Sequence, residues 1–150
     1  MTQTFVHNLQ HIIFSTKNRD KWIDESWSGN LYGYLGGILN RIGCKLLIAG
    51  GTSDHIHLLS SINKNLTIPE VIRTIKSSST AWIRKNIKNK KSFSWQSGYA
   101  AFSVGKLQAN QVERYIRNQR EHHRNMGFKD ELRKFLRKYD FEYDEKYLWR

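Results

Sequence analysis

The spacing of apolar residues changes several times along this chain, and this pattern limits the folds available to it. Apolar stretches typical of strands cover residues 7–15, 44–49, 55–62 and 92–104. Apolar residues recur at every third or fourth position, as is typical of helices, over 22–42 and 69–88. The elements therefore follow the order strand, helix, strand, strand, helix, strand. A Gly-Gly turn at 50–51 joins the second and third strands as a hairpin.

This order matches the split β-α-β-β-α-β arrangement. We therefore expect an α+β, ferredoxin-like fold, in which an antiparallel sheet carries two helices on one face. An appended strand and C-terminal helices complete the expected fold, with helices predicted over 110–125 and 129–139. The chain has 150 residues, one proline and no repeat, which favours a single domain over 1–150.

The charge of the chain indicates a polyanionic partner. It has 25 Lys and Arg against 13 Asp and Glu, so the formal net charge is +12. Nucleic acid is the simplest partner for so basic a small domain, and a merely basic, solvated surface is the alternative. The second predicted helix and the connector after it supply the DNA-binding candidates, which are Arg73, Lys76, Arg84, Lys85, Lys88, Lys90 and Lys91.

Several classes of protein do not fit this sequence. The single cysteine, Cys44, cannot form an internal disulfide or a cysteine-based zinc site within one chain. No apolar run has membrane-spanning length, and the N-terminus lacks the pattern of a secretion signal. We therefore expect a cytoplasmic protein without a membrane partner.

The six histidines occur in three pairs, of which the middle pair is the most informative. His55 and His57 flank Ile56 on a predicted strand, where alternate side chains point to the same face. Two neutral imidazoles side by side are suited to a divalent metal. Asp54 comes just before them and is placed to orient one ring. The alternative is a pair of solvent-facing histidines at a sheet edge.

Tyr115 and Gln119 form a second candidate pair. Their four-residue spacing on a predicted helix places the amide one turn from the phenol. The alternative for Tyr115 is a core aromatic residue with its hydroxyl at the rim. Beside a metal that polarises a phosphate, the hydroxyl can attack phosphorus. That reaction links DNA to tyrosine, keeps the bond energy for rejoining and needs no nucleotide cofactor.

Four segments resemble a known family in the same order. They are HIIFSTKNR (11–19), GGTSDHIHLLSSI (50–62), FSWQSGYAAFSV (93–104) and YIRNQREHH (115–123). With them the chain resembles the single-tyrosine transposases of the HUH endonuclease superfamily, of the IS200-like insertion-sequence type. In this resemblance Ile56 is the hydrophobic residue of the H-x-H motif.

The resemblance implies roles for particular residues. His55, His57 and Gln119 become metal ligands, and Tyr115 becomes the nucleophile. It also implies Mg²⁺ or Mn²⁺ as cofactor and single-stranded DNA with hairpin ends as substrate. Ligand chemistry alone also permits Zn²⁺ or Ni²⁺. A homodimer is implied as well, in which the tyrosine helix of one subunit can complete the site of the other.

Other functions remain open at this stage. A basic nucleic-acid-binding module on the same sheet would not need Tyr115. A metal-dependent hydrolase that uses water would cut DNA without a covalent adduct. A host-domesticated nickase of the same family would keep the chemistry and lose mobility.

Overall fold

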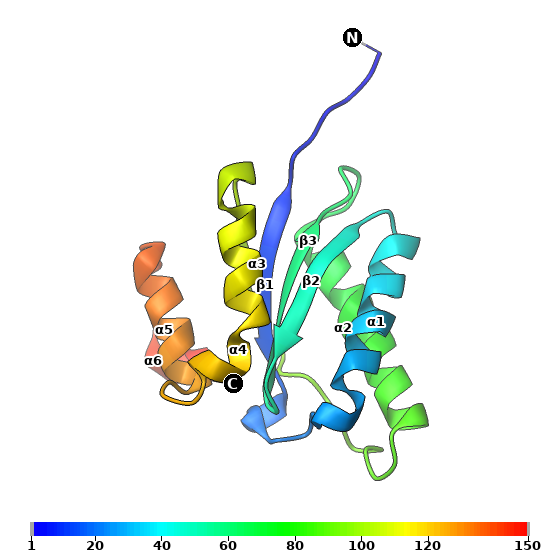
Figure 1. Ribbon diagram of the computed structural model, residues 1–150, viewed down its shortest axis with the longest axis vertical. Coiled ribbons are helices and arrows are strands. Elements are labelled where there is room, and N and C mark those ends of the chain that lie inside the picture. Colours follow the sequence, from blue (N-terminus) through cyan, green and yellow to red (C-terminus); the bar gives the residue numbers. More distant parts are fainter. Residues whose placement is uncertain (1, 150) are drawn as a thin grey trace.

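The computed structural model describes residues 2–149, and a four-stranded antiparallel sheet lies at its centre (Figure 1). The sheet order is β2-β3-β1-β4. The strands are β1 (Leu9–Ser15), β2 (Lys45–Gly51), β3 (His55–Ser61) and β4 (Ala100–Ser103). Helix α1 (Glu25–Arg41) connects β1 to β2, and α2 (Ile68–Asn86) connects β3 to β4. This topology confirms the predicted split β-α-β-β-α-β fold.

Helices α1 and α2 cover one face of the sheet (Figure 1). The main core on this face includes Ile12 and Phe14 of β1 and Ile56 and Leu58 of β3. Because strand side chains alternate, the residues between these point to the opposite face. The main core therefore directs His55 and His57 away from α1 and α2.

The C-terminal helices cover the opposite face (Figure 1). They are α3 (Ala109–Arg117), α4 (Gln119–His122), α5 (Phe128–Lys138) and α6 (Glu145–Leu148), and the short 3-10 turns η1 (Lys17–Arg19) and η2 (Lys106–Gln108) lie in the connections. Ile116 of α3 packs with Leu59 of β3, whereas Phe128 and Leu132 of α5 pack with the β1–β4 edge. No helix within residues 2–149 is long and apolar enough to cross a membrane.

Two predicted elements differ from those in the structure. The stretch 92–104 forms a strand only at Ala100–Ser103, with an isolated bridge between Thr16 and Trp95. No appended strand forms within residues 2–149, where the sheet has four strands. The ammonium of Lys76 donates to the carbonyls of Gln96 and Gly98 in the loop before β4, at 2.8 and 2.6 Å.

The predicted helix 110–125 is divided at Asn118. Asn118 has φ −98° and ψ 22°, so α3 ends at Arg117 and α4 begins at Gln119. The amide of His122 donates to the carbonyl of Asn118, which restarts the helical pattern. Gln119, the first residue of α4, is buried.

Gly50 of β2 permits the close approach of α3. A Cβ atom at this position would lie 2.5 Å from the carbonyl oxygen of Ile116. We predict that Gly50→Ala displaces α3 and lowers the free energy of unfolding by about 1–3 kcal/mol. Thermal unfolding measures the effect. Gly37→Ala is the control, because nothing lies within 4 Å of its Cβ and alanine favours a helix; equal stability of both variants would contradict this packing.

Candidate active site

His55 and His57 lie on the sheet face that the C-terminal helices cover. Both side chains are fully buried, and their ring centroids are 5.2 Å apart. His11 of the neighbouring strand β1 joins them, with its Nε2 2.8 Å from Nδ1 of His57. The structure thus places the H-x-H pair in a buried cluster, which excludes the solvent-facing alternative.

Tyr115 and Gln119 approach this cluster from α3 and α4. The Oε1 atom of Gln119 lies 3.0 Å from Nε2 of His55. The ring centroid of Tyr115 lies 5.9 Å from that of His57. The structure therefore brings together within one chain all four residues that the sequence singled out.

Glu131 of α5 is a further member of the cluster, and sequence reasoning did not select it. Its carboxylate is buried and accepts a hydrogen bond from the Tyr115 hydroxyl. Its Oε1 lies 2.9 Å from Nε2 of His57 and 3.5 Å from Nε2 of His55. Its Oε2 accepts a hydrogen bond from Nε2 of Gln119 at 3.1 Å. Glu131 thus contacts both histidines, the amide and the phenol.

The orientation of the Gln119 amide follows from these contacts. Because its Nε2 donates to Glu131, its Oε1 faces His55. The Asp54 carboxylate lies 2.8 Å from Nδ1 of His55, where it can orient that ring. Nε2 of His55 faces the Gln119 and Glu131 oxygen atoms, at 3.0 and 3.5 Å.

The donor atoms fit a divalent metal. One ligand atom each of His55, His57 and Glu131 lies within 4.8 Å of the other two. The Gln119 oxygen adds a fourth donor beside His55. Imidazole, carboxylate and amide donors suit Mg²⁺ or Mn²⁺ and also the later transition metals.

Burial and neighbouring charges set the protonation states. Burial lowers the pKa of His57 to about 4, so its imidazole is neutral at neutral pH. Burial alone would raise the pKa of Glu131, but the His123 and His57 rings beside its carboxylate outweigh burial and hold that pKa well below its usual range. Burial and the Glu131 charge raise the pKa of Tyr115, so the hydroxyl keeps its proton. The cluster therefore combines neutral imidazole, carboxylate and protonated phenol.

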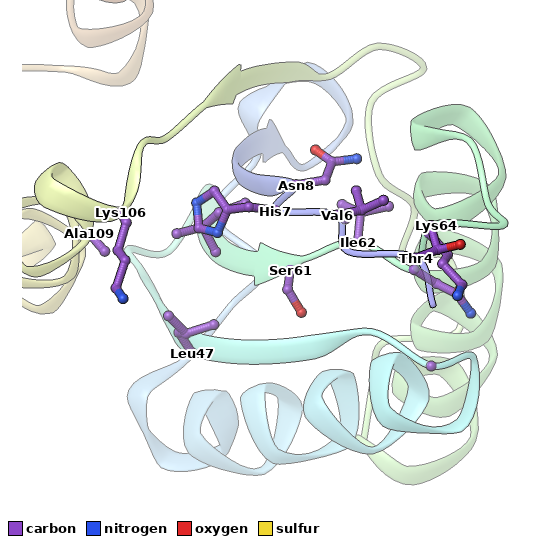
Figure 2. A pocket seen from close by; sticks show the side chains of 13 residues that line it. Thr4, Val6, His7, Asn8, Leu47, Ser61, Ile62, Lys64, Lys106 and Ala109 are labelled. Carbon is purple, nitrogen blue, oxygen red and sulfur yellow. The ribbon is translucent and has the colours of Figure 1, made fainter. Parts of the chain in front are cut away.

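The remaining histidines divide between the cluster and the periphery. His123 lies with its Nε2 3.1 Å from Oε1 of Glu131. His122 is exposed and stacks on the Tyr115 ring at 4.6 Å. His7 lies apart, in a separate hollow of about 530 Å³ beyond the ends of β1 and β3, with Lys64 and Lys106 on its margin (Figure 2). None of the candidate site residues lines that hollow.

Two of the predicted DNA-binding cations have structural partners. Lys76 holds the loop after α2, as described above, and burial lowers its pKa to about 8. Arg84 donates from Nε to the carbonyl of Phe93 at 2.8 Å. Both side chains thus hold the 93–98 loop, and these contacts occupy the donors that were predicted to contact phosphate.

The other predicted cations lie on α2 and its connector, across the sheet from Tyr115. The ammonium of Lys90 lies 5.3 Å from the centroid of the Trp22 ring. The exposed members are Arg73, Lys85, Lys88 and Lys91. Their distance from the site means that a bound strand must extend around the molecule to reach them.

A signal for Glu131 was present in the sequence. In the predicted helix 129–139, Glu131 lies on the apolar side between Phe128 and Leu132, both of which are buried. An acidic residue on the apolar face of a helix requires a buried partner. The sequence evidence for His11 is weaker: its position on a predicted strand, next to the core residue Ile12, places it on the face opposite the main core and indicates no partner.

Comparisons with known proteins agree with this geometry. A family model described as "Transposase IS200 like" matches residues 5–119, which takes in the H-x-H pair, Tyr115 and Gln119 and ends before Glu131. No curated protein sequence matches the chain.

Two solved structures share the fold. One is a candidate transposase from Deinococcus radiodurans, with a TM-score of 0.62 and 22% identity over 79% of this chain and 96% of that chain. The other is a REP-associated tyrosine transposase bound to a REP hairpin, with a TM-score of 0.60 and 13% identity over 82% of this chain and 73% of that chain. At these identities the likeness is one of fold.

Proposed function

Since this chain belongs to the IS200-like transposase family, we propose that it cuts and rejoins single-stranded DNA through a 5′-phosphotyrosine intermediate on Tyr115. The observation that carries this proposal is the buried carboxylate of Glu131, which touches the Tyr115 hydroxyl on one side and the two histidines on the other. Nucleophile and metal-ligating groups thereby share one centre. The whole chain, 1–150, acts as one domain in this proposal.

His55, His57, Gln119 and Glu131 are the proposed metal ligands, and Mg²⁺ or Mn²⁺ is the proposed ion. When bound there, the ion would draw electron density from a phosphate oxygen. Asp54 holds the His55 ring so that Nε2 points to the centre. His11 holds the His57 ring in the same way through Nδ1. Glu131 adds a negative charge that the two imidazoles lack.

The proposed reaction balances without a co-reactant. The Tyr115 oxygen bonds to phosphorus as its proton moves to Oε2 of Glu131, with which it is already in contact. The bond from phosphorus to the 3′-oxygen breaks, and that oxygen leaves as a 3′-hydroxyl by taking a proton from water, to which Glu131, with its low pKa, releases the proton it received from Tyr115. In rejoining, a 3′-hydroxyl attacks the phosphotyrosine, and the tyrosine recovers its proton. Because the pKa of Tyr115 is raised, its oxygen leaves phosphorus readily only when it takes up a proton.

A cleavage assay tests this function. Single-stranded oligonucleotides from the flanks of the gene are incubated with the protein in EDTA, and then with Mg²⁺ or Mn²⁺ added back. We expect a cut strand with a free 3′-hydroxyl and a protein-linked 5′ end, only with the metal. A cut strand without protein attached would favour the water-using hydrolase. Binding without any cut would favour the non-catalytic module.

The charge of the chain predicts salt-sensitive binding that prefers single strands or hairpins. With several phosphates neutralised, affinity should fall by about 10²-fold or more between low and physiological salt. Fluorescence anisotropy at a series of salt concentrations measures this. The hairpin carried by the REP-associated structural relative supports the inclusion of a hairpin end in the probe. Equal affinity for a plain duplex of the same sequence would contradict this preference.

We further propose a homodimer in which α3 can be exchanged between subunits. Strand β4 lies at the edge of the sheet, where it can pair with a second copy. Gly105 lies between β4 and η2, where its backbone freedom can take part in reorienting α3, whereas Gly98 precedes the paired strand. In the single chain described above, Tyr115 already reaches Glu131 of its own chain.

Mixing two inactive variants decides between these arrangements. If sites are shared, a mixed dimer of His57→Ala and Tyr115→Phe has one intact site. Random exchange should then restore about one quarter of the wild-type adduct, because half of the dimers are mixed. If the subunits are shown to exchange and no adduct returns, each site is built within one chain.

A further inference from the structure

A cavity of about 450 Å³ lies beside Tyr115, between α3, the β4 edge of the sheet and α5. The rings of Tyr115 and His11 form part of its wall. Its volume is within the range of about 300–1,000 Å³ that small-molecule sites occupy. The reaction proposed above needs a nucleotide on each side of the scissile phosphate, and this cavity adjoins the nucleophile.

The charges around this cavity are complementary to phosphate. Lys134 and Lys138 line it, four residues apart on α5, and both are exposed. No aspartate or glutamate belongs to its lining. Two neutral amides, of Gln108 and Gln111, add hydrogen-bonding groups opposite the lysines. A nucleotide in this cavity could place its phosphate beside the lysines and the polar edge of its base beside the amides.

The aromatic residues of the cavity provide a stacking surface. Phe135 and Tyr139 both line it, and both stack on Phe102 of β4, with ring centroids 5.4 and 4.6 Å apart. Phe102 is buried, so the stack is anchored in the sheet, while Tyr139 remains 40% exposed. Phe135 also contacts the Tyr115 ring edge-on at 5.6 Å. The stack therefore connects the opening of the cavity to the nucleophile.

We propose that this cavity binds the nucleotide adjoining the scissile phosphate, with its base against Tyr139 and its phosphate between Lys134 and Lys138. The proposal rests on the proposed role of Tyr115 as nucleophile. Because any base can stack on an aromatic ring, the subsite positions the strand without selecting a particular base. In this proposal α5 supplies both Glu131 and the lysines that contact the phosphate.

A scan of abasic positions through a cleavable oligonucleotide tests this subsite. Binding is measured by anisotropy in EDTA, so that the strand stays intact. We expect Tyr139→Ala to weaken binding of the intact strand by about tenfold, while Tyr139→Phe keeps the stacking and the affinity. One abasic position should cause the same loss in the wild type and no further loss in Tyr139→Ala. Its place, 5′ or 3′ of the cut, identifies the bound nucleotide.

Neutralising the lysines tests the phosphate contact separately. Lys134→Gln and Lys138→Gln should each lower the slope of log affinity against log salt by about 0.7. Arg137→Gln is the matched control, because Arg137 is exposed on the same helix and lies outside the cavity. Equal effects of all three changes, or additive losses from Tyr139→Ala and every abasic position, would overturn the subsite. Failure of the wild type to form an adduct with any strand would instead overturn the proposed function.

Discussion

Replacement of Tyr115 by phenylalanine is expected to abolish the covalent protein–DNA adduct and to lower cleavage by about 10³-fold or more. The variant loses one oxygen and keeps the ring, which packs against Phe135 and His122. The fold and the affinity for DNA should therefore change little. Denaturing gels with labelled single strands measure the adduct, and anisotropy measures the affinity.

Tyr143→Phe is the matched control for this experiment. Tyr143 is 37% exposed and lies outside the buried cluster, so its adduct yield should equal that of the wild type. An adduct that survives in Tyr115→Phe would place the nucleophile on another residue. Loss of adduct in both variants would show that the assay reports something other than the nucleophile.

Replacement of His57 is the second change with a large expected effect. His57→Ala removes one imidazole from the donor set, and cleavage should fall by about 10³-fold, since a Lewis acid contributes several kcal/mol to such a reaction. Affinity for DNA should remain, because lysines and arginines supply the phosphate contacts. Added Mg²⁺ or Mn²⁺ should not restore cleavage at concentrations that saturate the wild type.

Burial of His57 calls for two controls. Its ring is fully buried and contacts His11 and Glu131, so alanine leaves a cavity and an unpaired carboxylate. His57→Gln keeps a polar group there, and it should fold like the wild type while still failing to cleave. His7→Ala changes an exposed histidine outside the cluster and should cleave normally. Normal cleavage by a folded His57 variant would contradict the assigned metal site.

The sequence predicted the fold because its local signals agree with the tertiary packing. The start of α2 shows this clearly. The side chain of Thr67 accepts a hydrogen bond from the amide of Glu70, and Pro69 occupies the first turn. The start of α1 was predicted at Trp22, whereas the helix begins at Glu25, because the Asp24 side chain caps it. Such errors concern boundaries and leave the topology unchanged.

The shared orientation of His55 and His57 was predictable, because alternate side chains of a strand point to the same face. His55 and His57 share a face because Ile56 is required by the core on the other face. Tyr115 and Gln119 lie together even though Asn118 interrupts the helix between them. The helical spacing of Glu131 with Phe128 and Leu132 indicates that it faces the core, but its contacts with the histidines and Tyr115 depend on how α5 packs across the sheet. The match to the family model also ends before it.

Charge was a less specific guide than geometry. The closeness of the basic residues of α2 in the sequence predicts a DNA-binding surface, yet Lys76 and Arg84 hold a loop. Lys134 and Lys138 are not among the predicted DNA-binding residues, although they line the cavity beside Tyr115. Whether a cation meets phosphate depends on its neighbours in space, which the sequence does not give.

Mass spectrometry of the protein–DNA adduct tests the central claim most directly. The wild-type protein is incubated with a single-stranded oligonucleotide from the flank of its gene and Mg²⁺ or Mn²⁺, then digested with a nuclease and a protease. We predict a peptide containing Tyr115 that carries a nucleotide through its 5′-phosphate, and none when EDTA is present. A nucleotide on any other residue, or a cut strand beside wholly unmodified protein, would contradict the account.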